Sequence, residues 1–153
     1  MKVCTLLLLV RDDQILLAMK KRGFGAGRWN GVGGKVEPDE SIEAALIREC
    51  QEEIHVTPTH FEKVAVHDFI FPEGMSNMQV HTFVSDQWEG EPTETDEMAP
   101  QWFNQTDIPY EQMWQDDSYW IPQVLAGKKL HCRFMFDEKE NLIDGKVHEL
   151  PLV

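Results

Sequence analysis

The stretch GGKVEPDESIEAALIRECQEEIHV, from Gly33 to Val56, has a composition that ordinary core packing does not explain. A turn of closely spaced glycines leads through Pro38 to Ser41, a residue type favoured at the N-cap of a helix. Good helix formers follow this residue. At about 100° per residue, their apolar members fall on one stripe, which contains Ile42, Leu46, Cys50 and Ile54. The stretch therefore predicts a glycine turn followed by an amphipathic helix.

Three glutamates lie beside that apolar stripe. Glu49, Glu52 and Glu53 are spaced at i, i+3 and i+4, so their like charges destabilise the helix by roughly 0.2–0.5 kcal/mol per pair. A divalent cation that prefers oxygen ligands, Mg²⁺ or Mn²⁺, would offset this repulsion, and the glycine turn offers backbone carbonyls at the same place. The alternative is a solvated charged face, which is the usual location of a charge run on a helix.

The overall charge is strongly acidic, with 27 Asp and Glu against 14 Lys and Arg. A field of this sign repels duplex nucleic acid and anionic membranes. Five of the 14 basic residues nevertheless fall just before the predicted helix, namely Lys20, Lys21, Arg22, Arg28 and Lys35. A basic patch of this size in an acidic protein favours a compact anionic ligand.

The length and the cysteine content limit the class of protein. At 153 residues, the chain is predicted to form a single domain, over 1–153. Cys4, Cys50 and Cys132 are odd in number and widely spaced, which argues against a disulfide framework and a zinc cluster. The apolar run from Leu6 to Val10 is too short to span a membrane, and no signal-peptide pattern is present. We therefore expect a cytoplasmic protein.

The remaining elements are predicted mostly as strands. Alternating and continuous apolar segments predict strands at Val3–Val10, Ile15–Met19, Phe61–Phe71, Met78–Val84, Arg133–Phe136 and Leu142–Leu150. A short apolar piece is expected at Gln101–Asn104, a short helix at Ile108–Met113, and a second helix ending at Ala126. Together with the first helix, this pattern predicts an α/β protein.

The segment KKRGFGAGRWN, Lys20 to Asn30, combines glycines and bases with two aromatic residues. It can be a mobile surface loop. Against this interpretation, Phe24 and Trp29 are costly to expose and supply flat apolar faces of the kind that cover a purine ring. The amide of Asn30 offers both a donor and an acceptor for a base edge.

The segment WQDDSYW, Trp114 to Trp120, places adjacent carboxylates between tryptophans. Asp116 or Asp117 can simply be the N-cap of the second helix. The alternative is that both line an apolar pocket, where repulsion and desolvation raise one pKa. One Asp would then donate a hydrogen bond while its neighbour accepts one, and such a pair could recognise a purine edge.

Several other positions allow two interpretations. Thr5 interrupts an apolar strand and either bonds to the backbone or contacts a ligand. Phe69, Phe71 and Met78 belong to the core or to a pocket wall. Glu97 lies in an acidic loop, where a solvated charge is the simpler interpretation.

The glycine turn and helix resemble the Nudix box. The spacing matches at Gly34, Glu40, Arg48, Glu49, Glu52, Glu53 and Val56. His55 stands where the family has glycine, and Cys50 fills an apolar position. His tolerates the left-handed conformation that ends a helix better than β-branched residues do. We expect altered local geometry or some loss of stability at this position, and retained chemistry.

Beyond the box, the chain resembles the oxidised-purine nucleoside triphosphate hydrolases of the MutT-homologue group, especially the animal members. The matching segments are Met19–Gly31, the GGKVE that begins at Gly33, Thr95–Met98 and Trp114–Trp120. The resemblance implies a Nudix fold, an α/β/α sandwich with a mixed β-sheet. It also implies Mg²⁺-dependent hydrolysis of a triphosphate to a monophosphate and pyrophosphate.

The resemblance also implies residue roles. Metal ligation is expected from Glu49, Glu52, Glu53, Glu97 and the carbonyl of Gly33, with Arg48 orienting the carboxylates and Glu53 or a neighbour as general base. Asn30, Asp116 and Asp117 would recognise the modified base, and Trp114 would stack on it. The wider substrate site would contain Thr5, Lys20, Phe24, Val32, Gly33, Gly34, Lys35, Phe69, Phe71, Met78, Gln115 and Trp120.

The predicted function is hydrolysis of 8-oxo-dGTP, with 2-hydroxy-dATP and methylated purine nucleotides as further substrates, by a monomer that sanitises the nucleotide pool. Mn²⁺ could replace Mg²⁺. Two alternatives remain open. The same box serves hydrolases of dinucleoside polyphosphates, nucleotide sugars or ADP-ribose, and the chain could also be a nucleotide-binding module without catalysis.

Overall fold

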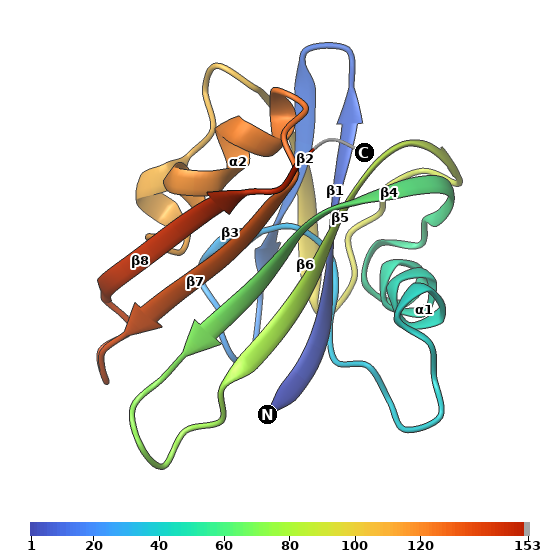
Figure 1. The fold of residues 1–153 in the computed structure, drawn as a ribbon. Coiled ribbons are helices and arrows are strands. Elements are labelled where there is room, and N and C mark those ends of the chain that lie inside the picture. Colours follow the sequence, from blue (N-terminus) through green and yellow to red (C-terminus); the bar gives the residue numbers. More distant parts are fainter. Residues whose placement is uncertain (152–153) are drawn as a thin grey trace.

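The computed structural model describes residues 1–151 as one mixed sheet with helices on both sides (Figure 1). The strands are β1 (Lys2–Arg11), β2 (Gln14–Lys20), β3 (Trp29–Asn30), β4 (Thr57–Ile70), β5 (Met78–Glu89), β6 (Met98–Asn104), β7 (Leu130–Phe136) and β8 (Leu142–Glu149). The helices are α1 (Ile42–Ile54), the single 3-10 turn η1 (Tyr110–Gln112) and α2 (Asp117–Leu125).

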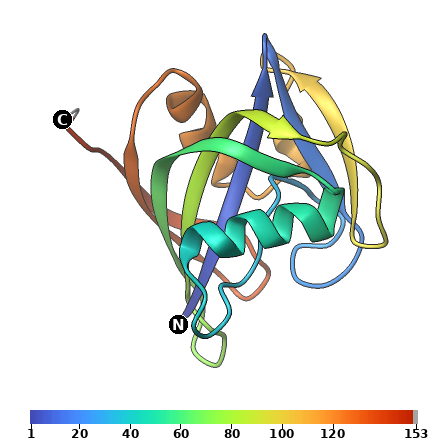
Figure 2. The same cartoon turned by 90° about the vertical axis from the view of Figure 1, so that its right-hand side faces the viewer.

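The sheet has the order β3-β2-β1-β5-β4-β7-β8, and β6 pairs with β2. β1 runs parallel to β5, and β4 runs parallel to β7, whereas the other neighbours are antiparallel. Helix α1 covers one side of the sheet and α2 the other (Figure 1; Figure 2). The predicted sandwich with a mixed sheet is therefore confirmed.

Helix α1 begins and ends as its sequence predicts. The Ser41 hydroxyl accepts a hydrogen bond from the Ala44 N–H at 3.1 Å and caps the first turn. His55 ends the helix with a φ of 61°, in the left-handed region, and its N–H donates to the Gln51 carbonyl at 3.1 Å. The expected change in local geometry is therefore not found, because His55 adopts the left-handed helix end that is usual for glycine. The expected loss of stability stays a prediction.

The apolar stripe of α1 supplies one of two cores. Leu46, Cys50 and Ile54 are buried against residues of β1 such as Leu7 and Leu9. Burial of each large aliphatic side chain contributes about 1.5–3 kcal/mol. The second core lies on the α2 side and takes Leu8 from the same strand. Successive residues of β1 therefore point into opposite cores, which explains why its sequence is continuously apolar.

Several elements differ from their predicted bounds: β5 continues beyond Val84 to Glu89, β7 begins at Leu130, and the segment predicted as a loop contains the short strand β3. β4 begins at Thr57, directly after α1, and pairs along β5 as far as Glu89. Register shifts in this pairing interrupt the alternation of side chains, so the sequence pattern conceals the strand. β6 extends over Met98–Asn104 because it pairs with the whole of β2, and Pro100 is tolerated since β6 has one neighbour. The expected short helix is only the turn η1.

Among residues 1–151, no helix is both long enough and apolar enough to cross a membrane.

Candidate active site

The glycine turn lies against β1 with no space for side chains. A Cβ on Gly33 would lie 1.9 Å from the Thr5 carbonyl oxygen, and one on Gly34 would lie 2.5 Å from the carboxyl carbon of Glu49. The Thr5 N–H donates to the Gly34 carbonyl at 2.8 Å. The Thr5 hydroxyl donates to that carbonyl at 3.4 Å, as the backbone-bonding interpretation predicts. The turn therefore brings backbone groups directly beside the acidic face of α1.

Glu53 is the most buried carboxylate of α1, with 4% of its surface exposed. Its Oε1 accepts a hydrogen bond from the Gly33 N–H at 2.9 Å. Burial raises the pKa of Glu53 to about 8, opposed by this hydrogen bond and reinforced by the charges of Glu49 and Glu97. Burial also raises the pKa of Glu49, which Arg48 opposes. In the metal-free protein the cluster therefore favours a retained proton over two ionised carboxylates.

Arg48 organises the outer part of this cluster. Its guanidinium donates to both carboxylate oxygens of Glu40, at 2.7 and 3.0 Å, and to the Lys35 carbonyl at 3.0 Å. It also donates to Glu49 at 2.9 Å and to Glu52 at 3.3 Å. The hydrogen bond from Arg48 lowers the pKa of Glu40 to about 2. Glu40 is thus a structural partner of Arg48. The spacing of the box includes Glu40, but the spacing alone predicted no role for it.

The expected metal ligands are not gathered into a ligand set. Within residues 1–151, no three His, Cys, Asp or Glu side chains are arranged so that they could hold a metal ion. Arg48 forms ion pairs with Glu49 and Glu52. Glu97 is exposed, and its Oε1 lies 3.7 Å from Arg22 Nη2. The donor chemistry nevertheless fits a hard divalent cation. Glu49 and Glu53 are carboxylates with raised pKa values beside a turn that only glycine can form.

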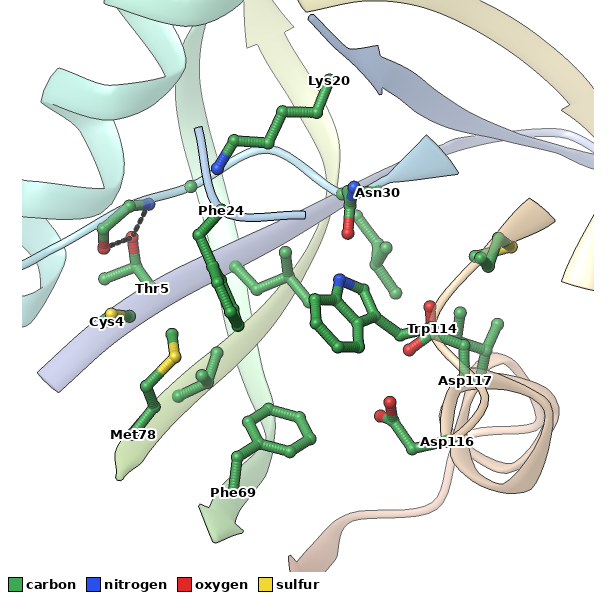
Figure 3. Close-up of a pocket in the computed structure, with 18 of the residues that line it drawn as sticks. Cys4, Thr5, Lys20, Phe24, Asn30, Phe69, Met78, Trp114, Asp116 and Asp117 are labelled. Atoms are coloured by element: carbon green, nitrogen blue, oxygen red, sulfur yellow. Dashed lines mark hydrogen bonds between the residues drawn. The ribbon is translucent and has the colours of Figure 1, made fainter. Parts of the chain in front are cut away.

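A cavity of about 160 Å³ adjoins this turn (Figure 3). Its volume is close to the ~150 Å³ of an apolar cavity that accommodates benzene, so it suits a flat ring. The predicted residues that line it are Thr5, Lys20, Phe24, Asn30, Gly33, Gly34, Phe69, Phe71, Met78, Trp114, Asp116, Asp117 and Trp120. Glu53 lines it as well. The structure therefore joins the glycine turn and the WQDDSYW segment in one site.

The aspartate pair lies across the cavity from Thr5 (Figure 3). Asp116 and Asp117 are 1% and 8% exposed, and the Trp120 indole N–H donates to Asp116 Oδ2 at 2.9 Å. Asp116 occupies the N-cap position of α2, but its side chain makes no capping hydrogen bond. The capping interpretation is therefore wrong for both residues, because the Asp116 carboxylate is directed to Trp120 and Asp117 is already the first residue of the helix.

Burial dominates the electrostatics of this pair. Desolvation raises the pKa of Asp116 to about 6, and the hydrogen bond from Trp120 opposes the shift. The pKa of Asp117 is raised well above its ordinary value, first by desolvation and then by the charge of Asp116. Near neutral pH the pair therefore retains a proton and presents an O–H donor beside a carboxylate acceptor.

The aromatic residues divide into cavity wall and outer packing. The Phe24 and Trp114 rings both line the cavity, with centroids 5.1 Å apart and planes inclined at 33°. The Trp29 ring packs on Phe103 with the ring centroids 4.9 Å apart, and its indole N–H donates to Gln112 Oε1 at 3.3 Å. Trp29 does not line the cavity. The prediction of a purine-covering face for Trp29 is therefore wrong. Adjacent strand residues point in opposite directions, so Trp29 and Asn30 cannot both face the site.

Three predicted substrate contacts also lie outside the cavity lining. Val32 is buried in the core beneath α1. Lys35 presents its carbonyl to Arg48, and Gln115 bonds to Asn141 and to the Leu142 N–H. Lining residues that the sequence analysis did not assign are Cys4, Leu6, Leu8, Gly31, Val80, Met98, Met113, Ile121 and Phe136. Strand alternation along β1 would have indicated Leu6 and Leu8.

Comparisons with known proteins agree with this geometry. The model of the NUDIX domain matches residues 2–124. An oxidized purine nucleoside triphosphate hydrolase of Danio rerio is 45% identical, over 97% of this chain and 96% of its own length. Its Mus musculus counterpart is 42% identical over the same shares. The crystal structure of a MutT protein from Bacillus halodurans superposes with a TM-score of 0.85 at 28% identity, covering 96% of this chain and 97% of that one. The chain belongs to the Nudix family.

Proposed function

We propose that this protein hydrolyses oxidised purine nucleoside triphosphates, such as 8-oxo-dGTP and 2-hydroxy-dATP, to the monophosphate and pyrophosphate. The observation that carries the proposal is a pair of buried carboxyl groups, Asp116 and Asp117, in a cavity that also contains the glycine turn. The names of the two animal relatives support the same substrate class. The proposed role is removal of damaged nucleotides from the nucleotide pool.

Recognition of the base would use the aromatic and carboxyl groups together. Trp114 lines the cavity and would stack on the base. The Asn30 amide donates to the Arg28 carbonyl at 3.0 Å, which leaves its oxygen free to accept from a base edge. The Asp116–Asp117 pair supplies a donor and an acceptor. Because the proton can move between the two carboxyl groups, the pair matches more than one edge pattern, so methylated purine nucleotides are included among the proposed substrates.

The opposite end of the cavity would bind the phosphates. Lys20 and the backbone of Gly33 and Gly34 line this end and suit an anion. Mg²⁺, with Mn²⁺ as a substitute, would be held by Glu49, Glu52, Glu53, Glu97 and the Gly33 carbonyl, and would supply charge neutralisation and water activation. Arg48 fixes the orientation of Glu40 and Glu49. Burial raises the pKa of Glu53 to about 8 in the metal-free protein, and a bound cation would favour the ionised carboxylate, which could then accept a proton from the attacking water.

The test is pyrophosphate release from 8-oxo-dGTP and dGTP measured side by side, with Mg²⁺ and with a chelator. The proposal predicts chelator-sensitive hydrolysis that favours the oxidised nucleotide at least about tenfold in kcat/KM. Equal rates on both nucleotides would remove the assigned role of the aspartate pair.

The same assay separates the alternatives. Dinucleoside polyphosphates, nucleotide sugars and ADP-ribose belong in the substrate panel, and a preference for one of them would replace the proposed substrate. Nucleotide binding without any metal-dependent phosphate release would indicate a binding module. We further propose a cytoplasmic monomer, which the three buried free cysteines and the acidic surface support. Light scattering measures the oligomeric state directly.

A further inference from the structure

Arg28 lies outside the cavity lining but contacts a ring that closes the cavity. Its guanidinium carbon is 4.1 Å from the centre of the Trp114 ring. A cation at this distance from an indole face is attracted by the ring quadrupole. Because Trp114 lines the cavity and Arg28 does not, Arg28 contacts the indole from outside the substrate space.

Glu140 holds Arg28 in this position. The Arg28 Nη1 donates to Glu140 Oε1 at 3.1 Å, and the two side chains are 27% and 29% exposed. Partial exclusion of water strengthens both the ion pair and the contact with the ring. Glu140 has a φ of 66°, a left-handed conformation that glycine adopts more readily. The backbone of this turn therefore does not require a glutamate.

The turn that carries Glu140 also holds the residue after Trp114. The Gln115 side chain donates to Asn141 Oδ1 at 3.0 Å and accepts from the Leu142 N–H at 2.8 Å. Asp137 braces the turn, since its Oδ1 accepts from the N–H groups of Lys139 and Asn141, both at 2.9 Å. The turn between β7 and β8 thus fixes Trp114 through Gln115 as well as through Arg28.

The backbone of Arg28 reaches two further residues of the site. Its carbonyl accepts from the Asn30 side chain at 3.0 Å and from the Lys20 N–H at 3.1 Å. Lys20 and Asn30 both line the cavity. Arg28 therefore contacts three of the residues proposed to bind the nucleotide without lining the cavity itself.

We propose that Arg28 and Glu140 form a clamp that positions Trp114 for stacking on the purine. Arg28 is a positioning residue that acts through Trp114. The clamp lowers the ordering cost of substrate binding, because the indole already has its bound orientation in the free protein. The inference deepens the proposed function and, in its kinetic part, rests on it.

The kinetic test uses Arg28→Ala and Glu140→Gly with 8-oxo-dGTP as substrate. We expect KM to rise about threefold to tenfold with little change in kcat, since the lost contact acts on binding. The matched control is Arg11→Ala, which removes a cation from the face of Trp102, at 4.3 Å, in another part of the sheet. That control should keep the wild-type KM. An Arg28→Ala enzyme with the KM of the Arg11→Ala enzyme would overturn the clamp.

Glu140→Gly separates positioning from simple stability. Glycine relieves the left-handed backbone at this position, so the thermal midpoint should stay constant or rise while KM rises. Glu138→Gln, an exposed residue of the same turn, should change neither quantity. A stable Glu140→Gly enzyme with unchanged KM would refute the part assigned to Glu140.

A second readout requires no nucleotide. The indole N–H of Trp114, assigned by its loss in Trp114→Phe, should have a backbone-like order parameter of about 0.85 in the wild type and fall below about 0.6 in Arg28→Ala. A rigid indole in Arg28→Ala would overturn the clamp whatever the substrate is. Conversely, failure of the wild type to hydrolyse 8-oxo-dGTP would refute the proposed function, and the relaxation measurement would still decide the clamp.

Discussion

The two ends of the cavity carry the same functional group in opposite surroundings. At one end, Glu49 and Glu53 lie beside a turn of backbone N–H and carbonyl groups, with Arg48 within hydrogen-bonding distance of Glu49. At the other end, Asp116 and Asp117 are buried, Trp114 and Trp120 line the same cavity, and the Trp120 N–H donates to Asp116. Burial raises the pKa of all four carboxyls.

The difference lies in how each end can neutralise its charge. The glutamate end has oxygen donors, a guanidinium and a glycine turn, which suit a cation. In the metal-free protein Glu53 also retains a proton, which a bound cation would displace. At the aspartate end, where apolar side chains line the cavity, a retained proton is what removes the charge. One end therefore suits phosphate chemistry, and the other suits donor and acceptor recognition of a base.

The largest expected effect is at the glutamate end. Glu53→Gln removes a charge and a proton acceptor, so we expect turnover of 8-oxo-dGTP to fall by about 10²- to 10⁴-fold. Nucleotide binding through the aspartate end should persist. Glu43→Gln, on an exposed position of the same helix, is the matched control. Near-normal turnover by Glu53→Gln would contradict the division of roles between the two ends.

The stability of the metal-free protein should depend on pH at both ends. The folded pKa values of Glu53, about 8, and Asp116, about 6, lie above their ordinary values of 4.5 and 3.8. The contribution of these two groups to the free energy of unfolding is therefore greatest below about pH 4. It decreases as the pH rises, because the unfolded chain loses its protons while the folded protein still retains them. For each group the loss is on the order of a few kcal/mol and is complete above its folded pKa.

Urea unfolding in chelator between pH 4 and pH 8.5 measures this loss. Glu53→Gln should remove the part of the stability loss that extends towards pH 8. Asp116→Asn should remove the part of the stability loss that ends near pH 6. Excess Mg²⁺ should restore stability at the glutamate end only. If Mg²⁺ stabilised Glu53→Gln and Asp116→Asn equally, the assignment of the cation to the glutamate end would be wrong.

The next effect concerns the aspartate end. Asp117→Asn keeps the shape of the side chain but prevents the pair from sharing a proton. We expect the preference for 8-oxo-dGTP over dGTP, as a ratio of kcat/KM, to fall at least about tenfold, or about 1.4 kcal/mol. Folding should be unaffected, because an amide avoids the burial of a charge. Full retention of selectivity would remove Asp117 from base recognition.

The smallest effect concerns a buried polar group behind the cavity wall. His67 is fully buried, its ring centroid is 4.3 Å from that of Trp120, and its Nε2 has no hydrogen-bond partner within residues 1–151. Its Nδ1 pairs with the Thr82 hydroxyl at 3.0 Å. Burial lowers the pKa of His67 to about 3, so the ring is neutral at pH 7.

Replacement of both polar partners tests whether His67 serves the aspartate end. The double variant His67→Leu with Thr82→Val should be at least as stable as the wild type and about 1 kcal/mol more stable than Thr82→Val alone, because it leaves no unpaired polar atom. Selectivity between 8-oxo-dGTP and dGTP should not change. A loss of selectivity would show that the aspartate pair depends on His67.

The glutamate end was largely predictable from the sequence because its determinants are local. The spacing of Ser41, Arg48 and His55 defines a cap, a charged face and a helix end, and each depends on neighbours within a few residues. Even here, the bidentate partner Glu40 and the absence of a gathered ligand set appear only in three dimensions.

The aspartate end was predicted only as one of two alternatives. The sequence of Trp114–Trp120 is compatible with an N-cap, and only the contact with Trp120 excludes it. Trp29 and Trp114 have the same side chain, yet of these two only Trp114 lines the cavity. The clamp on Trp114 joins Arg28 to Glu140, which are far apart in the sequence, and no local pattern contains such a pair.

The sequence by itself determined the helix, its caps and the existence of most strands, since these follow from periodicity and short spacings. The spacing of the box also indicated the Nudix family, and the mixed sheet came only from that resemblance. The tertiary structure decided which carboxyls are buried, which aromatic rings face the cavity and what holds them there. The physical reason is that burial and pKa depend on the exclusion of water by distant segments. A carboxyl such as Asp117 acquires its donor role only when strands and helices from the whole chain close around it.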